Sequence, residues 1–229
     1  QVGWAGWSSA ERGAVLRRAA AVLRDRAGDL ALLVTREMGK PLAEARAEVE
    51  KCATACDYYA EHAGEFLADE PVATSADRSW IGYEPVGVVL AVMPWNFPLW
   101  QVLRFAAPAL MAGNAVILRG GSEAHRSNQA IGKVLQAACA ETAVPQHAIQ
   151  VVRSTDRALV HEILQLESYI DLIIPRGGEE LIRATRIVAD GGAWLDHQIT
   201  GRVLETFRRV SGRSAAADHR LDLLTDRER

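Results

Sequence analysis

Two prolines enclose an amide in Met93–Pro98 (Met-Pro-Trp-Asn-Phe-Pro), directly after an apolar run. Proline fixes φ, so Asn96 is expected on a rigid turn. An amide donor held in this way can stabilise an oxyanion, an effect of about 3–4 kcal/mol. It can equally bond only to its own turn. The sequence leaves both interpretations of Asn96 open.

Two further apolar runs are each followed by an arginine and, directly after it, a pair of glycines. These are Arg119-Gly120-Gly121-Ser122-Glu123 and Arg176-Gly177-Gly178-Glu179. Glycine permits close approach of a backbone, and a helix N-terminus favours an anion such as a phosphate. A lone Gly-Gly is usually only a turn, but two with the same arrangement indicate a nucleotide site. The G-x-G-x-x-G fingerprint is absent, which weakens an ordinary Rossmann interpretation.

The elements that would position these segments alternate along the chain. Strands are predicted at 79–83, 87–92, 115–119, 149–152 and 170–174, and helices at 98–112, 124–141, 156–166 and 178–187. Strands alternating with helices of this length are typical of βαβ units with right-handed crossovers. The predicted fold is α/β: a Rossmann-like, doubly wound parallel sheet preceded by N-terminal helices. Ligands of such sheets bind outside the carboxyl ends of the strands, where the three segments fall.

The N-terminal part is predicted to be helical. Ser8 and Glu11 match a capping box, and apolar residues then recur at helical spacing until Gly39, which ends that helix. Pro41 suits the first turn of a second helix. We therefore expect a helical segment over 1–70, whose default role is packing, an α/β domain over 71–187 that carries the expected nucleotide site, and an unassigned tail over 188–229. One helix near 197–210 is the single element expected in the tail.

Composition excludes several classes of function. The net charge of −3 gives no basic surface for nucleic acid, and no apolar run approaches the roughly 20 residues of a membrane span. The three cysteines are too few for a disulfide framework, and Cys52 and Cys56 are more plausible as small buried residues than as metal ligands. No metal site is predicted. The N-terminus lacks both an initiator Met and a signal pattern, which indicates a fragment start and a cytoplasmic location.

Residues 1–113 resemble the N-terminal part of aldehyde dehydrogenases, particularly succinate-semialdehyde-type enzymes. The matching segments are Glu37–Pro41 (Glu-Met-Gly-Lys-Pro), Glu84–Val88 (Glu-Pro-Val-Gly-Val) and Pro94–Pro98. In that family the asparagine matching Asn96 helps to bind the substrate oxyanion. The resemblance therefore implies a nicotinamide-dependent oxidoreductase, with 71–187 as its nicotinamide-cofactor-binding α/β domain.

Residues 114–187 resemble another branch of the superfamily, glutamate-semialdehyde dehydrogenase (gamma-glutamyl phosphate reductase), which reduces an acyl phosphate with NADPH. The matching segments are 114–123 and 171–179. Aldehyde dehydrogenases usually carry a lysine that contacts the adenosine ribose where Arg119 stands. An arginine fork suits a phosphate, so the cofactor is NADP or NAD, with NADP favoured. The two resemblances together indicate a chimaera, in which the two branches are joined near Met111–Asn114.

The resemblance assigns site residues. Cofactor contacts are expected at Met93, Pro94, Trp95, Arg119, Gly121, Ser122, Glu123, Gly177 and Gly178, with Asn96 as the oxyanion donor. The expected partners are a nicotinamide dinucleotide and a small aldehyde or acyl-phosphate substrate, together with other copies of the chain, because relatives are usually oligomers.

The family's cysteine nucleophile and glutamate base belong to a C-terminal half with no match here. We therefore expect a truncated chain that does not oxidise an aldehyde alone. Three hypotheses follow: the cofactor-binding part of an oxidoreductase, an inactive remnant that binds a nucleotide or nothing, and an interaction module.

Overall fold

Four helices occupy the N-terminal part of the computed structural model, which describes residues 2–142, 146–156, 158–166, 168–177 and 179–189. They are α1 (Val2–Ala5), α2 (Ser9–Asp25), α3 (Ala27–Met38) and α4 (Leu42–Phe66). The predicted capping box is confirmed, with Ser8 accepting from the Glu11 amide and the Glu11 carboxylate accepting from the Ser8 amide. Gly39 ends α3 with φ 70°, as predicted.

The single helix predicted up to Gly39 is wrong in one respect, because it is broken at Arg26. This residue has φ −102° and ψ 13°, and its amide bonds back to Val22 and Arg24. The break falls in a polar stretch between Leu23 and Leu30, where no buried side chain requires a continuous helix. The two helices can then each pack against α4.

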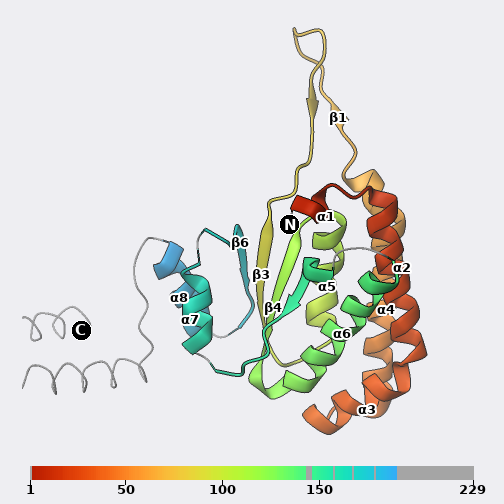
Figure 1. The fold of residues 1–229 in the computed structure, drawn as a ribbon, viewed down its shortest axis with the longest axis vertical. Helices are drawn as coiled ribbons and strands as arrows, with labels where there is room; N and C mark the ends of the chain where they lie inside the picture. The colour runs from red at the N-terminus through yellow and green to blue at the C-terminus, as the bar shows by residue number, and fades with distance from the viewer. Residues whose placement is uncertain (1, 143–145, 157, 167, 178, 190–229) are drawn as a thin grey trace, which may run out of the picture. The chain divides into compact units, whose positions relative to one another are not determined.

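A two-stranded antiparallel ribbon follows α4. It pairs β1 (Glu70–Pro71) with β2 (Trp80–Ile81), so the strand expected at 79–83 is present in shortened form. Figure 1 shows the ribbon extending away from the helices and the main sheet. The ribbon contributes no residue to the candidate site described below.

The remaining elements follow the predicted alternation of strands and helices. They are β3 (Val88–Met93), α5 (Trp100–Met111), β4 (Ala115–Gly120), η1 (Ser122–Ala124), α6 (His125–Glu141), η2 (Gln146–Ala148), β5 (Ile149–Val151), α7 (Ala158–Leu164), β6 (Leu172–Pro175) and α8 (Glu179–Ala189). Each of the four predicted main-sheet strands lies within two residues of an observed one. The helix expected near 197–210 lies outside the described residues. Within the described residues no helix has both the length and the apolar character that crossing a bilayer requires.

The main sheet is parallel and has the order β5-β4-β3-β6. The chain moves outward from β3 to β5 and then returns to the other side of β3 to form β6. Right-handed crossovers therefore put α5 and α6 on one face and α7 on the other. Figure 1 agrees: α5 and α6 lie between the sheet and α2–α4, whereas α7 lies on the opposite side, near β6. The prediction of a doubly wound sheet is confirmed.

The hydrophobic core joins the N-terminal helices to the sheet. The indole of Trp4, only 2% exposed, donates a hydrogen bond of 3.0 Å to the carbonyl of Leu110 in α5. Residues 1–186 form one compact unit. The functional boundary expected near residue 70 stays a prediction, but the helices on its N-terminal side are packed against α5 and α6.

Candidate cofactor site

The candidate residues lie at the carboxyl ends of three neighbouring strands. Met93, the last residue of β3, pairs with Gly120 of β4, and Val92 pairs with Pro175 of β6. The three turns that follow these strands are therefore adjacent at one edge of the sheet. Because the chain proceeds from β3 to β4 on one side and places β6 on the other, this edge contains the topological switch point. Open α/β sheets bind ligands at such points.

The turns after β3 and β4 are in direct contact. A Cβ added at Gly121 would lie 2.9 Å from the Trp95 nitrogen and 3.1 Å from its Cβ. A glycine is therefore needed at 121 because the Trp95 backbone lies against it. The sequence had instead led us to expect a ligand in this position. The Trp95 side chain itself points outward and is 52% exposed.

Asn96 lies on an exposed and unusual turn. The next residue, Phe97, has φ 52°, a left-handed conformation that costs a bulky residue about 1–3 kcal/mol. Within the described part of the chain, the Asn96 side chain makes no hydrogen bond. Of the two interpretations left open, the structure disfavours the one in which Asn96 only bonds its own turn. The amide is free to meet a ligand.

Arg119 is 6% exposed, and its guanidinium points to backbone carbonyls. It donates to Gly120, and at 3.1 Å to Thr155 in the segment after β5. In this conformation the side chain joins the ends of β4 and β5. A phosphate contact by Arg119 would require part of this arrangement to change.

The N-terminus of α6 differs from the sequence expectation of an open anion site. The Glu37 carboxylate from α3 accepts hydrogen bonds from the amides of Arg126 and Ser127, at 2.7 and 2.8 Å. These are among the donors that a phosphate would use. Ser122 and Glu123 precede them in η1, and Glu123 is exposed at the edge of the site.

The turn after β6 is the more open of the two glycine turns. Gly177 is exposed, and the Arg176 amide extends the β3–β6 ladder with a 2.8 Å bond to the Val92 carbonyl. The 11-residue helix α8 begins two residues after Gly177. Gly178 lies outside the described residues. Met93 is 2% exposed and belongs to the core, so only its backbone faces the turn region.

Two residues next to this site were not predicted from the sequence, Glu37 and Glu48. Their carboxylates accept from backbone amides that follow the turns after β4 and β3. The Glu48 side chain in α4 accepts from the amides of Leu99 and Trp100, each at 2.9 Å. A signal was present, because helical spacing puts Glu48 on the same face as Ala45, Val49 and Cys52. A charged residue within a buried stripe requires a specific partner.

None of the three cysteines is placed as a nucleophile. Cys52, Cys56 and Cys139 are buried, which confirms the interpretation of Cys52 and Cys56 as small core residues. Burial raises the pKa of Cys56 to about 12 and that of Cys139 to about 11. Burial, and then the neighbouring Glu48, raise the pKa of Cys52. Among the described residues, no group of His, Cys, Asp and Glu side chains is arranged to hold a metal ion.

Comparison with known proteins decides the family. The model of the aldehyde dehydrogenase family matches residues 1–186. The chain belongs to the aldehyde dehydrogenase family. This match includes the predicted junction near Met111–Asn114. The closer resemblance of 114–187 to glutamate-semialdehyde dehydrogenase stays a prediction.

Curated relatives of this aldehyde dehydrogenase family chain include semialdehyde enzymes. It is 54% identical over 129 residues to a probable succinate-semialdehyde dehydrogenase [NADP(+)] of Synechocystis, covering 56% of this chain and 28% of the relative. It is 44% identical over 131 residues to the succinate semialdehyde dehydrogenase [NAD(P)+] Sad of Escherichia coli, covering 57% and 28%. The matches thus span little more than a quarter of these relatives.

Solved structures agree on the fold. The succinic semialdehyde dehydrogenase of Streptococcus pyogenes, in complex with NADP+, superposes with a TM-score of 0.73 at 29% identity, over 82% of this chain and 40% of that one. The succinate-semialdehyde dehydrogenase of Burkholderia pseudomallei gives a TM-score of 0.75 at 29% identity, over 83% and 39%. The aldehyde-dehydrogenase-like α/β fold is confirmed.

Proposed function

We propose that this chain is the nicotinamide-dinucleotide-binding part of an oxidoreductase that acts on a small semialdehyde, with NADP as the preferred cofactor. The observation that carries the proposal is the alignment of three turns, those after β4, β3 and β6, at one sheet edge that contains the switch point. Relatives named as NADP(+)-dependent succinate-semialdehyde dehydrogenases support the choice of cofactor and substrate class.

The residues fit a dinucleotide, with a division of roles along this edge. The open turn at Gly177 and the start of α8 suit the pyrophosphate, because the glycine is exposed and a helix dipole follows. The turn around Ser122 and Glu123 lies on the β4 side and suits the adenosine ribose. The exposed Trp95 and Asn96 lie at the end of β3 and suit the reactive end of the cofactor and substrate.

Asn96 would then donate its amide N–H to the substrate carbonyl oxygen and stabilise negative charge that develops there. The nicotinamide, when bound, supplies the hydride acceptor. The chain's own contribution is binding and orientation, because its three thiols are buried. Free thiols also fit a reducing compartment, so a cytoplasmic location forms part of the proposal.

The test is a titration of the purified chain with NADPH and with NADH, followed by nicotinamide fluorescence and by thermal unfolding. We expect saturable binding that is tighter for NADPH. The melting temperature should also rise, because a ligand at 100 times its Kd adds about 2.7 kcal/mol to the free energy of unfolding. A cooperatively folded chain that binds neither dinucleotide would contradict the proposal and favour an inactive remnant.

A further inference from the structure

Two glutamates from the N-terminal helices contact the backbone of the helices that follow the candidate site turns. Glu48 of α4 accepts from the amides of Leu99 and Trp100, the N-cap and the first residue of α5, which begins after the turn Pro94–Pro98. Glu37 of α3 accepts from the first amides of α6, which follows Gly120–Glu123. Each glutamate therefore comes from outside the α/β domain and holds the backbone where one site turn ends and the next helix begins.

Glu48 is the more buried of the two, with a side chain only 1% exposed. One carboxylate oxygen accepts from both Leu99 and Trp100, and the other is paired with the ammonium of Lys40. The Lys40 nitrogen also lies 3.7 Å from the centre of the Phe97 ring. Hydrogen bonds to an ionised acceptor are about twice as strong as neutral ones, so this group offsets much of the cost of burying Glu48.

The consequence for the turn is geometric. Phe97 keeps its left-handed φ of 52° while its ring lies under Lys40 and the amides of Leu99 and Trp100 are held by Glu48. A strained conformation persists only where its surroundings determine it. Because Asn96 immediately precedes Phe97, its direction depends on the same contacts.

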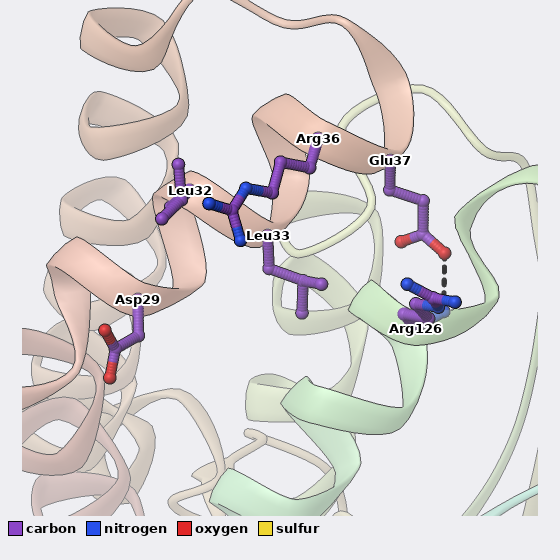
Figure 2. A pocket seen from close by; sticks show the side chains of 6 residues that line it. All are labelled: Asp29, Leu32, Leu33, Arg36, Glu37 and Arg126. Carbon is purple, nitrogen blue, oxygen red and sulfur yellow. Dashed lines mark hydrogen bonds between the residues drawn. The ribbon is translucent and has the colours of Figure 1, made fainter.

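Glu37 holds the second turn in the same manner. Figure 2 shows its carboxylate pointing from α3 to the start of α6, beside Arg126. The Ser127 hydroxyl, fully buried, donates to the same oxygen as the Ser127 amide, at 2.6 Å. Glu37 and Arg126 border a surface hollow of about 430 Å³ that Asp29, Leu32, Leu33 and Arg36 also line. Of the side chains that line this hollow, Glu37 is the one that accepts from the α6 backbone.

We propose that Glu37 and Glu48 are separate positioning residues for the two ends of the cofactor site. Glu48 fixes the turn that carries Trp95 and Asn96, and Glu37 fixes the turn of Gly120–Glu123. The inference rests on the proposed function in so far as this site binds a dinucleotide. It assigns to the N-terminal helices a role beyond packing.

The experiment compares Glu48→Ala, Glu37→Ala and the near-isosteric Glu48→Gln and Glu37→Gln, which keep one acceptor but lose the charge. Glu50→Ala is the matched control, because Glu50 also lies in α4 but is exposed and paired with Arg24. Backbone hydrogen exchange is measured at residues 97–101 and 124–128, with the buried face of α2 as a reference. Binding is measured with NADPH and with 2′,5′-ADP, a fragment that lacks the nicotinamide end.

We expect Glu48→Ala to accelerate exchange at 97–101 alone and to weaken NADPH roughly tenfold, with 2′,5′-ADP affected less than about twofold. Glu37→Ala should accelerate exchange at 124–128 and weaken both ligands. Each Gln variant should lie between its Ala variant and the wild type, and Glu50→Ala should match the wild type.

Three outcomes would overturn the inference: unchanged local exchange, exchange accelerated equally throughout the protein, or local acceleration with unchanged binding. A wild-type chain that binds neither ligand overturns the proposed function instead. In that case the exchange pattern alone decides whether the two glutamates hold the two turns.

Discussion

The carboxylate of Asp171 accepts a 2.7 Å hydrogen bond from the backbone amide of Val88, 83 residues earlier in the chain. Asp171 also donates its own amide to the Val88 carbonyl, at 3.0 Å. The residue before β6 is thereby joined to the first residue of β3. This contact fixes the register at the amino end of the β3–β6 pair, and the register determines which residues emerge at the carboxyl end, where the candidate site lies.

Gly87→Ala should destabilise the protein strongly. Gly87 has φ 134°, and an added Cβ would lie 2.0 Å from the Asp171 Oδ2 and 2.5 Å from its Cγ. Backbone strain and overpacking together predict a loss of roughly 2–4 kcal/mol in the free energy of unfolding. Urea denaturation measures this loss.

Gly28→Ala is the control for that variant. Gly28 is exposed near the start of α3, and a Cβ there meets nothing within 4 Å. Alanine favours a helix over glycine, so stability should rise by up to about 1 kcal/mol. Equal stability losses in both variants would contradict the proposed clash at Gly87.

Asn96→Ala should leave stability within about 0.5 kcal/mol, because the side chain is exposed and makes no hydrogen bond within the described residues. Asn114→Ala provides the contrast, since its buried amide accepts from Gly87 at 3.0 Å and donates to Ala109 at 3.2 Å. That variant should lose about 1–3 kcal/mol. A comparable loss for Asn96→Ala would restore the interpretation that Asn96 serves only its own turn.

Gly121→Ala should destabilise by about 1–3 kcal/mol, because the new methyl group meets the Trp95 backbone, which cannot easily move. Gly177→Ala should stay within about 0.5 kcal/mol, because its nearest neighbour is the flexible end of Leu181, at 2.9 Å. Chemical denaturation of the two variants in parallel tests the difference. The idea that Trp95 requires a glycine at 121 fails if Gly121→Ala is as stable as the wild type.

The cysteines should resist alkylation in the folded protein. With a pKa of about 11, Cys139 is thiolate to about one part in a thousand at pH 8, and burial also blocks the reagent. Mass spectrometry after iodoacetamide treatment should find no modification without denaturant and all three cysteines modified in guanidinium. Rapid modification of one thiol in the native protein would instead identify a nucleophile, and an assay with succinate semialdehyde and NADP+ would follow.

The periodicity of the sequence was sufficient for the main elements of the fold. Apolar runs such as Val88–Val92 are typical of strands buried on both faces, and the alternation with helices predicted a parallel sheet. The order of the strands in the sheet could not be predicted, because nothing in the residues of β5 or β6 indicates which strand each one pairs with. The break at Arg26 was missed since the apolar stripe keeps its spacing from Leu23 to Leu30.

The candidate site was predictable in its location but only partly in its contacts. The glycine pairs indicated close approach, yet at Gly121 the approaching group is Trp95. Arg119 and the start of α6 were expected to be open to an anion, but they bond to Thr155 and Glu37. These partners are distant in sequence, and a polar side chain shows only that it needs a partner, not where in the chain that partner lies.

The bond from the Trp4 indole to the Leu110 carbonyl bears on the order in which the chain folds during synthesis. A ribosome adds about 5–20 residues per second, so the buried tryptophan near the N-terminus waits several seconds before its acceptor emerges. Glu37 likewise precedes its partners, the amides at 126 and 127, by 89 and 90 residues. Until then the helices emerge with their apolar faces uncovered, and a nascent chain at this stage is a natural client for a chaperone that binds exposed hydrophobic surface.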